Sequence, residues 1–484
     1  MRFLVFLFLV FYLSINTYCQ KKYLFINDDN IAKTYGVNRT INNPVKHNLN
    51  PLIIADKEWE EGVNCFGSVI YDNNKFRMWY QIYNAKEKTD KRFAYTVGYA
   101  ESSDGISWTK PNLDIFEYKG SRQNNLVLLS YGASDLYSPA VVKDLAEKDL
   151  AKRYKMFYWD CMSDENLKKH GNPFPKGVNV PGWTALDGEG FFVAFSPDGI
   201  TWTKHGTQPV FTCACDASSL ILDKDGSYKS YFKISNASDR HFRVLGYSES
   251  NDFLKWTTPK TILEPDWKDE HGTEFYGMSV TNYFNNYIGL IWMYYNSPSD
   301  KLMDIQFATS NNSIDWQRAG DRKVFLPVGK SGEWDAGAAI VASQMIVSPD
   351  IDKDKIYIYY GGSTTRHDDS RKYHRENTIG LATIRLDGFA SMDAKLFKGF
   401  IETNPITPNN KNMYINAIAN KGYIQIDVVN PKTGEVIAKS KEVKNIDKTK
   451  ILITFENNWQ LTTTQEYAFR FNMQKASLFS FWFE

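Results

Sequence analysis

Carboxylate side chains recur at one position of a repeated pattern along this chain of 484 residues. Each of five short apolar segments that we interpret as strands closely follows an acid. These acids are Glu60 with Glu61, Asp135, Asp216, Glu274 and Asp335. If the five segments converge on one axis, the carboxylates share a cavity, and mutual repulsion keeps some of them protonated. A protonated carboxyl beside an ionised one is the pair that glycosidic bond cleavage requires, whereas the alternative for each acid is a local bond to backbone amides.

The segments belong to a repeat whose clearest element is the sequence S-x-[D/N]-x-x-x-W. It occurs at residues 102–108, 196–202, 250–256 and 310–316, with a degenerate copy at 382–389. Asp-Gly and Asn-containing steps are typical of tight turns. The Ser and Asp side chains can bond backbone amides within such a turn, and the Trp is expected to pack back on the sheet. We therefore interpret each copy as a hairpin.

The strand-like segments around the turns predict the architecture. Each unit reads as three strands, the third entering the turn, and an outer strand after it. Five units predict an all-β fold, a five-bladed β-propeller over residues 50–392. Period-two alternation, as at residues 423–429, predicts a β-sandwich over 393–484. Residues 20–49 are then an N-terminal extension.

The N-terminus has the layout of a secretory signal peptide over residues 1–19, with Arg2 before an apolar run too short to span a bilayer. Cleavage after Cys19 predicts a secreted or periplasmic protein without a membrane span, and a lipid anchor on Cys19 is less favoured. The 57 basic and 56 acidic residues nearly balance, which argues against nucleic acid as a partner. Four further cysteines are interpreted as mostly buried, with room for one disulfide: Cys65, Cys161, Cys213 and Cys215.

The chain resembles the five-bladed propeller glycoside hydrolases, a group that includes families 32, 43, 117 and 130, and it is most similar to bacterial family-32-like hydrolases. The resemblance is carried by the repeated turns, Asn50-Pro51, Trp334-Asp335-Ala-Gly337, Tyr359-Tyr-Gly-Gly362 with His367 after it, and residues 399–403, Asn416-Ala417 and 478–482. It covers nearly the whole chain beyond the signal peptide. It implies cleavage of glycosidic bonds in oligosaccharides, with exo action on plant or algal material, no required cofactor, and room for a structural Ca²⁺ in the central channel.

The resemblance also implies roles for individual residues. By position in the units, Glu274 is the general acid, Asp216 orients the substrate and tunes the acid, and Glu60 is the base or nucleophile. The chain departs from families 32 and 43 at the first unit, where Glu60 or Glu61 stands in place of their Asp. Retention or inversion stays open, because it depends on the separation of the carboxylates.

Further candidates surround the predicted mouth of the channel. For substrate binding they are Asp135, Asp335, Tyr276, Arg243, His47 and Trp334. His367 is a candidate ligand for a central cation, with a hydrogen-bonded structural histidine as the alternative. Core packing is the alternative for the aromatic residues, and an ordinary surface position is the alternative for Arg243.

Three other functions stay open at this point. A non-catalytic carbohydrate-binding propeller would share the turns and the aromatic residues but would not need Asp216 together with Glu274. A polysaccharide lyase would use Tyr or His as a base beside a charge-neutralising group. A sialidase-like enzyme is less favoured because the arginines do not fall at equivalent positions of the units.

Overall fold

The computed structural model describes residues 21–132, 136–173, 188–212, 216–235, 243–296, 301–367 and 377–484. This part of the chain is all-β apart from short helical turns and one α-helix, α1 (Asp164–His170). Within it, no helix is long and apolar enough to cross a membrane. Cys65 is a buried free thiol, and Cys161 is also buried. The predicted signal peptide, Cys213 and Cys215 lie outside the described residues.

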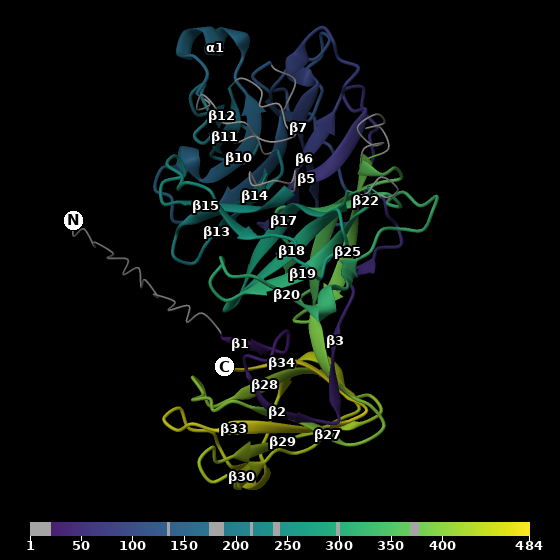
Figure 1. Ribbon diagram of the computed structural model, residues 1–484, viewed down its shortest axis with the longest axis vertical. Helices are drawn as coiled ribbons and strands as arrows, with labels where there is room; N and C mark the ends of the chain where they lie inside the picture. Colours follow the sequence, from purple (N-terminus) through teal and green to yellow (C-terminus); the bar gives the residue numbers. More distant parts are fainter. Residues whose placement is uncertain are drawn as a thin grey trace, which may run out of the picture.

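Four sheets of mainly antiparallel strands make up the larger part of the molecule (Figure 1), and we describe them as five units by dividing the ten-stranded sheet in two. Unit one contains β5 (Gly62–Asp72), β6 (Lys75–Tyr83), β7 (Tyr95–Ser102) and β8 (Leu126–Leu129). Unit two contains β9 (Tyr137–Lys143), β10 (Tyr154–Cys161), β11 (Glu189–Ser196) and β12 (Thr203–Lys204). Unit three contains β13 (Ser218–Leu222), β14 (Tyr228–Ser235), β15 (Arg243–Ser250) and β16 (Lys260–Leu263).

Units four and five are joined by one parallel bridge, between Met303 and Ala338. Unit four contains β17 (Thr273–Tyr283), β18 (Asn286–Tyr295) and β19 (Met303–Ser310), with β20 (Gln317–Arg318) and β21 (Val324–Leu326) at its edge. Unit five contains β22 (Ala338–Val341), β23 (Ile346–Val347), β24 (Lys355–Ser363) and β25 (Asn377–Arg385). Its outer strand is β4 (Val45–Lys46), which comes from the N-terminal part of the chain.

Hydrogen bonds between the first strands of successive units connect all five units. They join Ser68 Oγ to Val141 N, Ser138 Oγ to the Asp216 carbonyl, Ser219 Oγ to the Met278 carbonyl, Ser279 Oγ to the Val341 carbonyl, and Ser343 N to the Gly67 carbonyl, at 2.6–3.1 Å. The last bond returns from unit five to unit one. The first strands of the units are therefore linked in a closed series.

The repeated turns have the predicted internal bonds. In the first turn, Ser102 Oγ accepts from Gly105 N at 2.9 Å, and Asp104 Oδ1 accepts from Ile106 N and Ser107 N at 2.8 and 2.7 Å. The turns at 196–202, 250–256 and 310–316 repeat the bonds that the Asp or Asn accepts. This confirms the interpretation of the motif.

Each turn also contacts a neighbouring unit. Trp79 of unit one donates to the Gly199 carbonyl in the turn of unit two at 2.6 Å. Tyr359 of unit five donates to the Gly105 carbonyl in the turn of unit one at 2.7 Å. The turns thus connect units in the same circular order as the serines.

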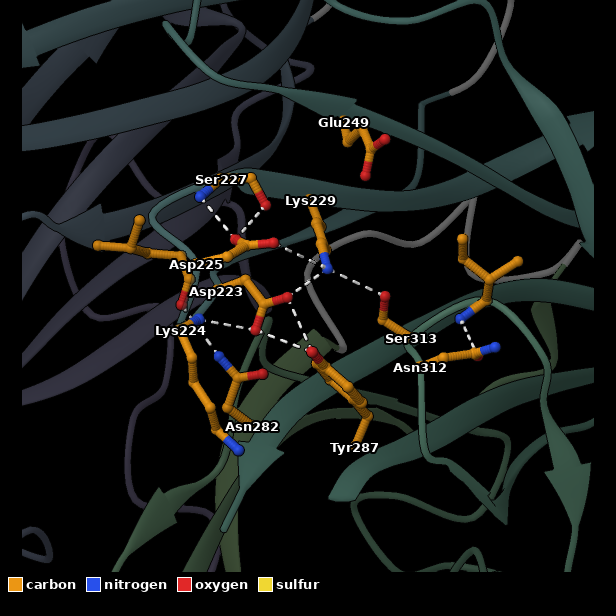
Figure 2. Close-up of polar contacts among 12 residues, drawn as sticks. Asp223, Lys224, Asp225, Ser227, Lys229, Glu249, Asn282, Tyr287, Asn312 and Ser313 are labelled. Carbon is orange, nitrogen blue, oxygen red and sulfur yellow. Dashed lines mark hydrogen bonds and ion pairs between the residues drawn. The ribbon is translucent and has the colours of Figure 1, made fainter. Parts of the chain in front are cut away.

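Three unit boundaries contain the same aspartate–tyrosine contact. The carboxylates of Asp72, Asp144 and Asp223 accept from the hydroxyls of Tyr154, Tyr228 and Tyr287 in the next unit, at 2.6–2.8 Å. Figure 2 shows the third case, in which Lys229 also pairs with Asp223 and donates to Ser313. Burial and then the bond to Asp223 raise the pKa of Tyr287 above its ordinary value. The tyrosine therefore stays a neutral donor across this boundary.

Two six-stranded sheets form the smaller part of the molecule, below the units in Figure 1. One contains β1 (Lys22–Leu24), β3 (Val37–Ile41), β26 (Ala390–Ala394), β28 (Met413–Ile418), β32 (Asp447–Leu452) and β34 (Ala476–Phe483). The other contains β2 (Ile31–Tyr35), β27 (Gly399–Thr403), β29 (Tyr423–Val429), β30 (Val436–Lys439), β31 (Val443–Lys444) and β33 (Ala468–Gln474). Side chains of both sheets share one apolar core. Strands β1–β3 belong to the segment expected as an N-terminal extension, and they pair with C-terminal strands.

Candidate functional site

Asp216 and Glu274 lie where successive units begin. Asp216 lies two residues before the start of β13, and Glu274 is the second residue of β17. Each carboxylate is paired with a cation of unit three: Asp216 with Lys233, and Glu274 Oε2 with Arg243 Nη1 at 2.5 Å. Asn296 Nδ2 donates to Glu274 Oε1 at 2.7 Å. Both carboxylates are therefore held in ion pairs, and the Glu274 side chain is almost fully buried.

The ring of Tyr276 connects the two ion pairs. Lys233 Nζ lies 4.3 Å from its centroid, and the Arg243 guanidinium carbon lies 5.5 Å from it. The structure therefore brings Asp216, Glu274, Tyr276 and Arg243 together as one group. We call the set Asp216, Lys233, Arg243, Glu274, Tyr276 and Asn296 the acid cluster.

Aromatic residues adjoin the acid cluster. The His367 ring packs at 4.9 Å from Tyr276 and 4.8 Å from Tyr294, and its backbone N–H donates to the Lys301 carbonyl. Tyr294 lies opposite Glu274 in the register of β17 and β18.

A β-bulge sets the direction of the side chains at the start of β17. The register with β18 shifts between Phe275 and Gly277. An added Cβ at Gly277 would lie 2.4 Å from the Trp292 ring, so only glycine fits there. Bulges re-aim side chains at the ends of strands. Unit one contributes Phe66 to the same region, with its ring 5.3 Å from that of Trp292.

Glu60 and Asp335 have contacts of a different kind. Glu60 accepts from Tyr80 at 2.7 Å and pairs with Lys110 at 2.5 Å, all within unit one. Asp335 accepts from Tyr360 at 2.8 Å and pairs with Lys46 at 2.6 Å, all within unit five. In the described residues neither carboxylate bonds to the acid cluster. Glu61 pairs with Lys86 at 3.6 Å instead.

The remaining candidates also have local contacts. His47 Nδ1 accepts from Leu49 N at 3.2 Å. Trp334 packs 5.2 Å from Tyr360 and fills the space beside Gly362. Asp135 lies outside the described residues. Within those residues no three His, Cys, Asp or Glu side chains gather to hold a metal ion, and the cation roles of His367 and the channel stay predictions.

Lys233, Asn296 and Tyr294 were not among the residues predicted from the sequence. Lys233 follows the repeated aromatic strand pattern at 228–232 and is almost completely buried, although it is charged. A charged residue directly after the aromatic pair Tyr231 and Phe232 is the signal that could have identified it. Asn296 and Tyr294 come from the end of β18, and only the pairing of that strand with β17 places them at Glu274.

No protein-family model matches the sequence, and no curated protein matches it. Several solved structures of carbohydrate-active enzymes are similar to the chain. A β-1,2-mannobiose phosphorylase from Listeria innocua has a TM-score of 0.48 and 12% identity, covering 71% of this chain and 97% of its own. A glycosyl hydrolase from Bacteroides ovatus has a TM-score of 0.47 and 16% identity, and the match covers 71% of this chain and 94% of the hydrolase. A family 43 arabinoxylan arabinofuranohydrolase from Bacillus subtilis has a TM-score of 0.43 and 13% identity, and the match covers 91% of this chain and 99% of that enzyme. At these scores the similarity carries no conclusion on function.

Proposed function

We propose that this chain is a secreted glycoside hydrolase, exo-acting on plant or algal oligosaccharides, with the acid cluster as its active site. The observation that supports this most is that Asp216 and Glu274 come from equivalent places in successive units and flank one tyrosine ring. A pair of carboxylates facing one sugar is what glycoside hydrolysis uses.

The architecture that we propose is a five-bladed β-propeller followed by a β-sandwich. Two sets of contacts support it: the serine bonds between the first strands, and the turns that contact neighbouring units. Each set includes a hydrogen bond between unit five and unit one. The shared apolar core of the two C-terminal sheets supports the sandwich.

In this proposal Glu274 is the general acid and Asp216 is the second carboxylate. While Glu274 is paired with Arg243, it is a hydrogen-bond acceptor with no proton to give, so it must receive a proton before it can act as the general acid. Substrate entering beside Tyr276 would separate this pair and give Arg243 a new partner. Glu60 is not given the role of base, because its described contacts lie in unit one.

The test is the hydrolysis rate of Glu274→Gln and Asp216→Asn on a panel of plant and algal oligosaccharides. We expect each change to lower kcat by about 100- to 10,000-fold, the usual contribution of a general acid or base. Each change also breaks an ion pair, so rates are compared per folded molecule. Glu60→Gln is the matched control, because it breaks a similar buried pair in unit one. Near-normal turnover by either acid variant, or an equal loss in the control, would refute the assignment.

A polysaccharide lyase is the second candidate. Tyr276 and Tyr294 lie beside Arg243, which is the combination of a base and a charge-neutralising group that β-elimination needs. A lyase leaves an unsaturated product that absorbs in the ultraviolet, and a hydrolase does not. A non-catalytic binding propeller would release no product at all.

A further inference from the structure

A polar cavity lies away from the acid cluster. Its volume is about 1040 Å³, and it lies between the N-terminal residues 26–29 and the outer part of unit four. Five basic and five acidic side chains line it. A cavity with balanced charge and many polar groups favours a neutral, hydroxyl-rich ligand over an ion.

This cavity opens on the opposite face of unit four from the acid cluster. Thr273, Met293 and Tyr295 line it, whereas Glu274 and Tyr294 belong to the cluster or adjoin it. Alternate residues of a strand point to opposite faces of its sheet. The two sites are therefore separated by the sheet itself.

An exposed tryptophan lies beside the cavity. Trp267 is 87% exposed, the highest exposure among the large hydrophobic residues of the described chain. It lines a smaller cavity of about 400 Å³, which shares Asp269, Glu270 and Thr273 with the larger one. A single aromatic plane at the edge of a polar cavity is suited to stacking on a sugar ring.

A fixed hydrogen-bonding network forms one wall. Arg318 pairs with Asp269 at 2.7 Å and donates to Gln306 at 2.6 Å, and both members of the ion pair are buried. Arg322 bridges Asp269 and Asp266, the residue before Trp267. Because these side chains hold one another, they are pre-organised for hydroxyl groups.

A buried hydroxyl lies in the wall that the two cavities share. Thr273 is 3% exposed and lines both cavities, and its Oγ1 has no hydrogen-bond partner within the described residues. A buried hydroxyl without a partner costs free energy. Asp321 and Arg322 on the cavity wall have positive φ angles of 54° and 61°, and strain of this kind is frequent at binding sites.

We propose that Trp267 and the two cavities form a binding site for a neutral oligosaccharide chain, distinct from the acid cluster. The substrate class rests on the proposed function, but the binding does not depend on cleavage. Trp267 stacks on one sugar ring, while the wall of Arg318, Asp269 and Arg322 bonds neighbouring hydroxyl groups.

The experiment is native affinity electrophoresis of the full chain in the Glu274→Gln background, which prevents digestion of the gel. The gels contain arabinoxylan, arabinogalactan, galactomannan or, as the anionic probe, polygalacturonate. We expect retardation in at least one neutral gel, weakened about tenfold by Trp267→Ala and largely restored by Trp267→Phe. Phe397→Ala is the matched control, since Phe397 is 80% exposed but lies between β26 and β27.

The outcomes separate this inference from the proposed function. Retardation that depends on Trp267 would stand even if the wild-type protein cleaved nothing. Equal retardation of the parent and Trp267→Ala, retardation only by polygalacturonate, or none in any gel would overturn the inference. A change of oligomeric state in Trp267→Ala without weaker retardation would identify the surface as a protein contact and also overturn it.

Discussion

At the scale of single residues, acids at equivalent places in the repeat have different environments. Glu60 and Asp335 are each bound by a lysine and a tyrosine of their own unit. Asp216 and Glu274 instead pair with cations that share the Tyr276 ring. All four acids were candidates from the sequence. The sequence could not separate the acids that bond within their own unit from those of the acid cluster, because Lys46 and Arg243 are distant in sequence from the acids they bind.

The first prediction concerns Glu60 as a stabilising residue. Its side chain is fully buried and pairs with Lys110, which is 9% exposed. Glu60→Gln leaves the Lys110 ammonium with the more exposed Asp56 as its charged partner, beside the Ile54 carbonyl. We expect the free energy of unfolding to fall by about 3 kcal/mol, measured by urea denaturation.

The double variant Glu60→Gln/Lys110→Met tests the physical reason. It removes the uncompensated charge, so it should recover part of the stability that the single change loses. A loss of catalytic rate without a loss of stability in Glu60→Gln would contradict the structural role and return Glu60 to the active site.

At the scale of elements, the turns were predictable because their bonds are local. Ser102 and Asp104 bond amides within three residues, so the motif alone contains the information. The outer strand of unit five was not predictable in this way. Strand β4 pairs with β25, more than three hundred residues later in the chain, and no short pattern encodes a partner at that distance.

The second prediction concerns the acid sensitivity of the turns. Burial alone would raise the pKa of Asp104, but bonds from Ser107, Ile106 and Ser102 outweigh it and lower the pKa to about 2. The pKa values of Asp198 and Asp252 are lowered in the same way. A lowered pKa in the folded state gives stability that is complete above the unfolded value of 3.8 and is lost as the pH falls toward about 2.

The fourth turn supplies the control for this prediction. Asn312 occupies the Asp position and accepts the same two backbone bonds. Asp104→Asn should therefore keep the turn. In this variant the urea concentration at the unfolding midpoint should decrease less than in the wild type when the pH is lowered from about 5 to about 2.5. Asn312→Asp should steepen that fall. Parallel pH profiles for the wild type and both variants would contradict the assigned cause.

At the scale of the whole molecule, the two parts are connected through Asp387 in the degenerate fifth turn. Its buried carboxylate accepts from Lys22 of β1 at 2.8 Å, Ser480 of β34 at 2.6 Å and Tyr283 of unit four at 2.5 Å. The sequence predicted the turn and the all-β character of the tail. It did not predict that N-terminal strands complete the C-terminal sheets, since that pairing joins opposite ends of the chain.

The third prediction follows from this junction. Lys22 is 4% exposed and its partner carboxylate is fully buried, so Asp387→Asn leaves a buried ammonium without a counter-charge. We expect the free energy of unfolding to fall by about 3 kcal/mol. Because the same residue connects β1, β34 and unit four, we also expect the two parts to unfold less cooperatively. Scanning calorimetry would show this as a higher ratio of calorimetric to van 't Hoff enthalpy.

The matched control is Glu442→Gln, which breaks the exposed pair with Lys444 in the C-terminal sheets. Exposed pairs contribute at most about 1 kcal/mol, so this variant should unfold nearly as the wild type does. If Asp387→Asn behaved like the control, the buried junction would not couple the two parts. The coupling would then have to come from the surface pairs along the same boundary, such as Arg385 with Asp447.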